Sequence, residues 1–161
     1  MTDFRALIQA LCSSEVRFVL VGGVAATLHG SARLTQDVDI VYSRDGGNLG
    51  RIAAALGPLQ PYLRGAPAGL PFLLDQQTLA HGLNFTLTTL AGDIDLLGEI
   101  TGVGNYDALV AHTIEVELFG GRCKCLDLPT LIAAKIAAGR PKDLEVIAEL
   151  RALLDEKPPG G

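Results

Sequence analysis

Two pairs of aspartates, each spaced two residues apart in an apolar run, most constrain how this chain can fold. Asp37 and Asp39 lie in the sequence DVDIV, and Asp93 and Asp95 lie in DIDLL. Because side chains on a strand alternate between its faces, each pair places its carboxylates on one face and its apolar neighbours on the other. Such acids are costly to leave without a partner. A hard divalent cation such as Mg²⁺ takes oxygen ligands, so Asp37 and Asp39 predict half of a metal site.

The first acid pair closes a longer pattern over residues 18–41. An unbroken apolar run over 18–21 predicts a buried strand over 16–21, Gly22 and Gly23 end it, and a short helix ends at Gly30 before the acid strand. A Gly-Gly turn leaves bare N–H groups at a helix N-terminus, where phosphate can approach closely. A doubly wound dinucleotide-binding domain starts similarly, but the chain lacks its Gly-x-Gly-x-x-Gly spacing and also lacks a P-loop Gly-Lys-Ser or Gly-Lys-Thr.

The remaining chain alternates between helical and strand patterns. The stretch 57–71 is rich in proline and glycine and is expected to be a surface loop without regular structure. The other predicted elements are a helix over 3–13, a helix over 49–56, a turn or short helix over 72–79, strands over 83–90 and 93–97, a helix over 106–112, strands over 113–119 and 122–126, and helices over 128–139 and 141–156. They predict one α+β (α/β two-layer) domain over 1–156, with a short mixed sheet and helices packed on it, and a disordered tail over 157–161.

Composition limits the partners and the location. The chain of 161 residues is 48% hydrophobic and 19% charged, as in an ordinary globular protein. Its net charge of −5 argues against a broad surface that neutralises many nucleic-acid phosphates, although a local basic patch is compatible with it. No apolar run approaches the roughly 18 to 20 residues of a membrane span, so we expect a cytoplasmic protein without a membrane partner.

Three blocks of the sequence together resemble one protein family. They are GGVAATLHGSARLTQDVDI over 22–40, GDIDLLGEI over 92–100 and KIAAGRPKDLEVI over 135–147. In this order they resemble the polymerase-β-like nucleotidyltransferases, and most specifically the small bacterial branch that includes the AbiEii-type abortive-infection toxins. The resemblance implies a transferase that moves a nucleoside monophosphate from an NTP to an acceptor hydroxyl with two Mg²⁺ ions.

The resemblance also assigns roles to the acids and glycines. Asp37 and Asp39 would bridge the metals, and Asp95 would be the third catalytic carboxylate, with Asp93 as the reserve candidate because alternation alone does not separate the two. Gly22 and Gly23 would cradle the nucleotide phosphates through backbone amides. The family often has serine at the position of Gly23, and the serine hydroxyl also binds phosphate. In this chain the backbone amides or Ser31 would supply that contact.

Further nucleotide-binding residues follow from the same resemblance. Arg33 and Thr35 match an Arg-x-Thr-x-Asp signature, in which the guanidinium would clamp phosphate. Lys135 and Lys142 would neutralise the triphosphate, and Asp143 would orient or deprotonate the acceptor. The alternative for Lys135 is a solvated helix charge, and for Asp143 a first-turn acid stabilised by the helix dipole.

The resemblance leaves three classes of function open. The first is an active nucleotidyltransferase whose acceptor is a tRNA, a protein or a small molecule, with an antitoxin as partner if the toxin resemblance extends that far. The second is a nucleotide-binding module without turnover, against which the intact set of acids argues. The third is one subunit of a two-chain nucleotidyltransferase complex.

Overall fold

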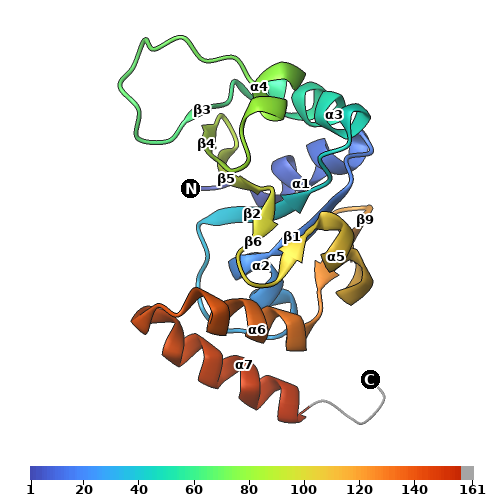
Figure 1. Ribbon diagram of the computed structural model, residues 1–161, viewed down its shortest axis with the longest axis vertical. Coiled ribbons are helices and arrows are strands. Elements are labelled where there is room, and N and C mark those ends of the chain that lie inside the picture. Colours follow the sequence, from blue (N-terminus) through green and yellow to red (C-terminus); the bar gives the residue numbers. More distant parts are fainter. Residues whose placement is uncertain (157–161) are drawn as a thin grey trace.

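The computed structural model describes residues 1–156 (Figure 1). Its helices are α1 (Phe4–Ser13), α2 (Gly22–Leu28), α3 (Gly46–Leu56), α4 (Gln76–His81), α5 (Tyr106–Leu109), α6 (Leu128–Ala138) and α7 (Leu144–Glu156). Its strands are β1 (Phe18–Val21), β2 (Asp37–Tyr42), β3 (Tyr62–Leu63), β4 (Phe85–Thr89), β5 (Gly92–Leu97), β6 (Glu99–Ile100), β7 (Gly104–Asn105), β8 (Thr113–Leu118) and β9 (Gly121–Leu126). Short 3₁₀ turns are η1 (Gly57–Leu59), η2 (Val110–His112) and η3 (Pro141–Asp143).

Seven of the strands form one mixed sheet in the order β3-β4-β5-β2-β1-β9-β8. Strand β2 runs parallel to β5 and β1 runs parallel to β9, whereas the other neighbours are antiparallel. This arrangement confirms the predicted α+β class with a short mixed sheet. The two central acid-bearing strands are neighbours although about fifty residues separate them in the sequence.

The two acid-bearing strands bury one face and leave the other open. Val38 and Ile40 of β2 and Ile94 and Leu96 of β5 are fully buried. The aspartates between them are only half-buried, as the alternation of a strand requires. The apolar face therefore fixes the register of both strands, because a slip of one residue would expose these four side chains and bury the acids.

Helix α1 begins and packs as its sequence predicts. The Asp3 carboxylate caps it by accepting a hydrogen bond of 3.0 Å from the Ala6 N–H. Its buried residues, Leu7, Ile8 and Leu11, lie at helical spacing. The helix packs against α3 and β9, so it covers part of the sheet.

Helices α6 and α7 form a hairpin at the bottom of Figure 1. Asp127 caps α6 by accepting a hydrogen bond from the Thr130 N–H, and α6 ends at Gly139, whose φ of +64° is left-handed. Helix α6 also contacts α2, the helix that begins at Gly22. The hairpin is thereby held against α2.

The expectation that 57–71 has no regular structure was wrong. The stretch contains η1 and the two-residue strand β3, which pairs with β4 at the edge of the sheet. Prolines flank this strand without lying in it, and an edge strand tolerates them because one side of its backbone needs no partner. The helix predicted over 49–56 also starts earlier, at Gly46.

Two other expectations concern the whole chain. The predicted tail at 157–161 lies outside the described residues, and the boundary of a single domain at residue 156 stays a prediction. Within residues 1–156, no helix combines the length and the hydropathy needed to span a membrane.

Candidate active site

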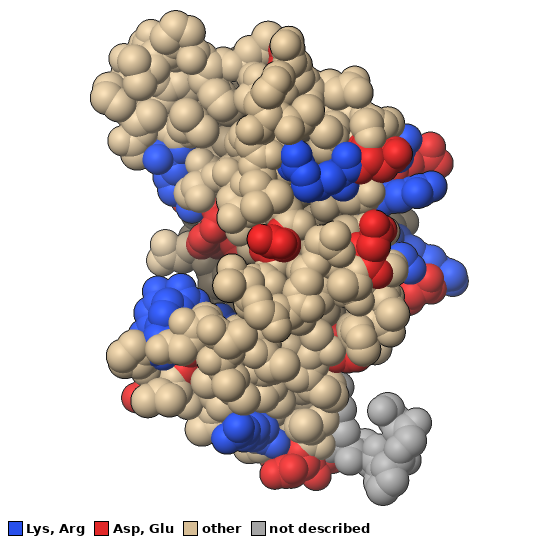
Figure 2. Space-filling model, viewed as in Figure 1, with Lys and Arg blue, Asp and Glu red and all other residues tan. Residues whose placement is uncertain are grey.

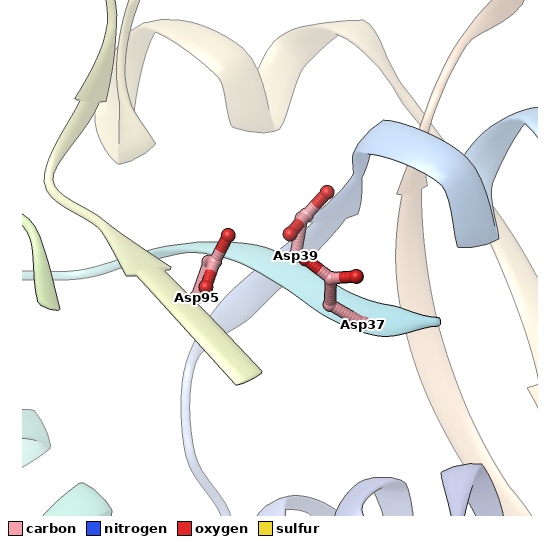
Figure 3. Close-up of side chains that lie close together, drawn as sticks. All are labelled: Asp37, Asp39 and Asp95. Atoms are coloured by element: carbon pink, nitrogen blue, oxygen red, sulfur yellow. The ribbon is translucent and has the colours of Figure 1, made fainter. Parts of the chain in front are cut away.

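The parallel pairing of β2 with β5 brings the two acid pairs together. In this register Asp37 lies opposite Asp93, and Asp39 lies opposite Asp95. Because paired residues of neighbouring strands point to the same face, the acids line one open patch of the sheet. Asp37, Asp39 and Asp95 each offer a carboxylate oxygen, and these oxygens lie within 4.8 Å of one another (Figure 3). This spacing suits oxygen ligands of a shared cation.

Within the described residues, Asp39 is the one acid of the patch that makes no ion pair with Arg64. Its Oδ1 atom is buried and has no hydrogen-bond partner; Asp95 Oδ1 is buried in the same way but lies 2.9 Å from Arg64 Nη2. Burial, the negative charges of Asp95 and Asp37 and a hydrogen bond with Asp95 together raise the pKa of Asp39 to about 7, while the charge of Lys135 acts in the opposite direction. An acid held in this way needs either a proton or a cation, so the three carboxylates fit a divalent metal.

The Gly-Gly turn packs directly against the acid strand. A Cβ atom on Gly22 would lie 2.1 Å from Asp39 Oδ2, and Gly22 has a φ of +63°. A Cβ atom on Gly23 would lie 2.5 Å from Thr35 Oγ1. Both glycines are therefore required by close packing and, at Gly22, by backbone conformation. Contact of their backbone N–H groups with nucleotide phosphates stays a prediction, in addition to this structural role.

Arg64 lies in the acid patch, and sequence analysis did not find it. Its Nη2 lies 2.9 Å from Asp95 Oδ1, its Nε lies 3.3 Å from Asp93 Oδ2, and its Nη1 lies 3.7 Å from Asp37 Oδ2. Arg64 follows β3 in the proline-rich stretch, where no periodicity indicates which way a side chain points. The sequence offered one indirect indication, because four carboxylates on one face of a sheet require a cation nearby. It did not indicate which basic residue would supply that charge.

The predicted phosphate ligands Ser31 and Arg33 are bonded to α7. The Ser31 hydroxyl donates a hydrogen bond of 2.7 Å to Glu149, and this bond lowers the pKa of Glu149 together with the Ala32 N–H and Arg33. Arg33 lies 3.2 Å from the carboxylate of Glu145 and 3.7 Å from that of Glu149. The loop between α2 and β2 is thereby fastened to the helical hairpin.

Thr35 lies between the glycine turn and the acid strand. Its hydroxyl donates a hydrogen bond of 3.2 Å to the Asp37 carbonyl, and its side chain contacts the position where Gly23 lacks a Cβ. Thr35 therefore supports the start of β2. Of the predicted nucleotide-binding residues in this region, Gly22, Gly23 and Thr35 lie beside the acids.

A second cluster of charges lies where α6 joins α7. Asp143 is only 3% exposed, and its Oδ2 accepts a hydrogen bond of 2.8 Å from Arg140 Nε. Lys135 Nζ lies 3.7 Å from Asp143 Oδ1. Burial pushes the pKa of Asp143 upward, but the bond from Arg140 and the charges of Lys135, Arg140 and Lys142 lower it overall. Lys142 itself is exposed.

The charged groups form a recess flanked by positive charge. Figure 2 shows acidic side chains in a hollow on the left of the molecule, with one basic group directly above it and another directly below. The positive charge of Lys135, which pairs with Asp143, lowers the pKa of Asp39 as well as that of Asp143. The arrangement offers a cation site beside positive side chains, which is what a triphosphate and its metal require.

Comparisons with known proteins identify the fold. The sequence matches no protein-family model and no curated protein. A protein from Thermotoga maritima assigned as a nucleotidyltransferase has a similar structure, with a TM-score of 0.57 and 18% identity over 95% of this chain and 91% of that one. The protein ANT(2")-Ia, solved in complex with adenylyl-2"-tobramycin, gives a TM-score of 0.58 and 13% identity over 93% of this chain and 84% of that one.

A third similar structure comes from a eukaryote. The antigenic nucleotidyltransferase-like protein of Paracoccidioides brasiliensis gives a TM-score of 0.58 and 19% identity, over 97% of this chain and 75% of that one. At such identities the likeness concerns the fold. The chain therefore has the α+β fold of nucleotidyltransferases, and its β2 and β5 strands carry a triad of aspartates.

Proposed function

We propose that this protein is a metal-dependent nucleotidyltransferase that moves a nucleoside monophosphate from an NTP to an acceptor hydroxyl. The observation that carries the proposal is the triad of Asp37, Asp39 and Asp95, with its buried and unpartnered Asp39 oxygen, in a chain with this fold. An intact triad argues against a binding module without turnover, because a protein that only bound nucleotide would not need three clustered acids.

In the proposed reaction the acceptor hydroxyl attacks the α-phosphorus of the NTP. The new bond joins the acceptor oxygen to phosphorus, the bond to the bridging oxygen breaks, and pyrophosphate leaves with its electron pair. Asp37, Asp39 and Asp95 would hold Mg²⁺, with two ions expected from the chemistry. When bound, such ions neutralise the charge on the attacking and leaving oxygens. The hydroxyl proton passes to solvent or to a carboxylate of the patch.

The positive side chains would bind the triphosphate. Lys135 is the best placed, because its charge already acts on Asp39. The N–H groups of Gly22 and Gly23 lie at the start of α2, beside Asp39, where a phosphate bound to the metal would meet them. Arg33 and Ser31 would join only after leaving their glutamate partners on α7, and Lys142 would act from the exposed turn.

Asp143 is proposed to act near the acceptor by positioning two basic side chains. Its lowered pKa makes it a poor proton acceptor, but its ion pairs hold Arg140 and Lys135 in place. An assignment as general base would require its cation partners to move away. The stabilising role therefore needs fewer changes than the catalytic one.

The acceptor is proposed to be a small hydroxyl-bearing molecule or the end of a tRNA. The structure of ANT(2")-Ia contains an adenylylated aminoglycoside, which supports a small acceptor. The AbiEii-type resemblance supports a tRNA, and with it a cytoplasmic toxin whose partner is an antitoxin. The net charge of −5 favours acceptors that contact only a small part of the surface. A protein acceptor or a partner subunit would be revealed by copurification.

The test is calorimetric titration of each of the four NTPs with Mg²⁺ into wild-type protein and into an Asp37→Ala, Asp39→Ala double variant. Asp107→Asn is a matched control, because Asp107 is an exposed acid on α5, outside the triad. We expect Mg²⁺-dependent binding of at least one NTP by the wild type and the control, and none by the double variant. Failure of well-folded wild type to bind any NTP would refute the proposal for the isolated chain.

A triad variant also tests turnover. With the preferred NTP labelled at its α-phosphate, label should pass to an acceptor in a mixture of tRNA, protein or aminoglycosides, and pyrophosphate should appear in equal amount. The Asp37→Ala, Asp39→Ala variant should transfer no label. NTP binding without transfer to any acceptor class would favour the subunit of a two-chain complex.

A further inference from the structure

Arg64 is the main cation in contact with the acid patch, and the proposed function does not use it. Its guanidinium lies within 2.9 to 3.7 Å of carboxylate oxygens of Asp37, Asp93 and Asp95. The same Nη2 atom donates hydrogen bonds to the carbonyls of Leu87, at 2.6 Å, and Ile94, at 3.4 Å. The guanidinium therefore contacts the backbones of β4 and β5 as well as the acids.

Two of the three triad acids take part in these contacts. Asp95 Oδ1 and Asp37 Oδ2 face Arg64, whereas Asp39 makes no ion pair within residues 1–156. A cation that used the facing oxygens would have to displace the guanidinium, and a positive charge this close repels any second cation. Arg64 and a divalent metal therefore compete for the same negative charge.

The chain around Arg64 permits the side chain to leave. Arg64 follows β3, which is two residues long and pairs with β4 at the edge of the sheet. Its backbone N–H donates a hydrogen bond of 3.0 Å to the Thr86 carbonyl, which can persist when the side chain moves. Residues 64–75 form no helix or strand and bulge outward at the top left of Figure 1.

We propose that Arg64 is an exchangeable counter-cation, which neutralises the acid patch in the metal-free protein and is displaced when a divalent cation binds. The arginine stabilises four clustered carboxylates between catalytic cycles, at the cost of weaker metal binding. The metal would then bind well only when the triphosphate brings further negative charge, which couples metal binding to nucleotide binding. The inference rests on the proposed function, because it requires a divalent cation at the triad.

The experiment measures Mn²⁺ binding without nucleotide, from the loss of the electron paramagnetic resonance signal of the free ion. Arg64→Met removes the guanidinium and keeps an apolar stem of similar length. Arg122→Met is the matched control, because Arg122 is an exposed arginine that also pairs with two acids, Glu115 and Glu117, on β8. Both variants change the net charge by the same amount.

We expect Arg64→Met to bind Mn²⁺ at least about tenfold more tightly than wild type, which corresponds to about 1.4 kcal/mol. Arg122→Met should bind as wild type does. Arg64→Met should also melt at a lower temperature than wild type in EDTA, and Mn²⁺ should restore more of its stability than it restores in wild type. Arg64→Lys keeps the charge with a single ammonium group, so its Mn²⁺ affinity should lie between those of wild type and Arg64→Met. This variant is measured if Arg64→Met does not fold.

Two results would overturn the inference. If wild type binds Mn²⁺ and the Arg64 variants bind it equally or more weakly, Arg64 orients the acids and does not compete with the metal, while the proposed function stands. If neither wild type nor the Arg64 variants bind Mn²⁺, both the inference and the metal-dependent function fail. The two failures are therefore distinguishable in one set of titrations.

Discussion

Asp39 and Asp143 are aspartates in similar surroundings with opposite electrostatics. Both have carboxylate atoms buried from solvent, and the charge of Lys135 lowers the pKa of both. Asp143 has Arg140 at 2.8 Å and a lowered pKa, whereas Asp39 has other acids as neighbours and a pKa raised to about 7. The charge of Asp143 is therefore neutralised by side chains of the chain itself. The charge of Asp39 is not, so this carboxylate is available to bind a cation or a proton.

This difference separates a structural acid from a ligand-binding one. Sequence motifs assign catalytic roles to both residues, since each lies in a block that resembles nucleotidyltransferases. Their contacts distinguish the two residues. A buried carboxylate with a cation partner, such as Asp143, is compatible with a stable fold, whereas one without a partner, such as Asp39, costs stability until it binds a cation or a proton. Four predictions test whether the division holds.

The largest effect is expected on metal-dependent NTP binding. Asp39→Asn removes a charged ligand of the triad and should weaken that binding by at least about 100-fold, because even residues that only support a metal ligand cost 10- to 100-fold. Asp143→Asn should weaken it by less than about tenfold. Calorimetry with the preferred NTP and Mg²⁺ measures both. Equal losses would remove the distinction between the two acids.

The same two variants should shift stability in opposite directions. Breaking a buried ion pair costs about 3 to 5 kcal/mol, but Arg140 is 50% exposed, so Asp143→Asn should lower the free energy of unfolding by about 2 kcal/mol. Asp39→Asn should raise it by about 1 kcal/mol in EDTA at alkaline pH, because repulsion from Asp37 and Asp95 disappears. Urea unfolding gives both values. A destabilised Asp39→Asn would contradict the comparison.

The pH dependence of the metal-free protein should follow Asp39. A group with a raised pKa in the folded state contributes stability below its unfolded value of 3.8, and that contribution is lost as pH rises through about 7. The wild-type protein in EDTA should therefore lose stability from this group between about pH 4 and pH 8, and Asp39→Asn should not. Urea midpoints across this range test the difference. Saturating Mn²⁺ should remove the loss, because the metal requires the ionised carboxylate.

The smallest effects are expected at the lysines, of which Lys135 acts on the pKa of both aspartates. Lys135→Met should raise the pKa of Asp39 further and weaken NTP binding by roughly threefold to tenfold, because it removes one charge near the phosphates. Lys142→Met should have a smaller effect, since that side chain is exposed. Titration of the NTP into each variant measures the order. A larger loss from Lys142→Met would place the triphosphate on the exposed turn.

Local patterns predicted most of the architecture. The alternation of acids and apolar residues in 37–41 and 93–97 located both strands, and helical spacing and capping residues located α1, α6 and α7. The stretch 57–71 was misjudged, because pairing with β4 made a short strand where proline and glycine predicted none. Propensity describes the isolated chain, and an edge strand receives its order from its neighbour.

The sequence by itself determined that Asp37 and Asp39 share a face, because alternation is a property of the single strand. The tertiary structure decided which other groups meet them. The parallel register of β2 and β5 brought Asp95 beside Asp37 and Asp39, and the fold placed Arg64 against Asp37, Asp93 and Asp95. It also gave Arg33 glutamate partners from α7. Such contacts join residues far apart in the chain, so only the packing of the apolar core, which sets strand order and register, brings them together.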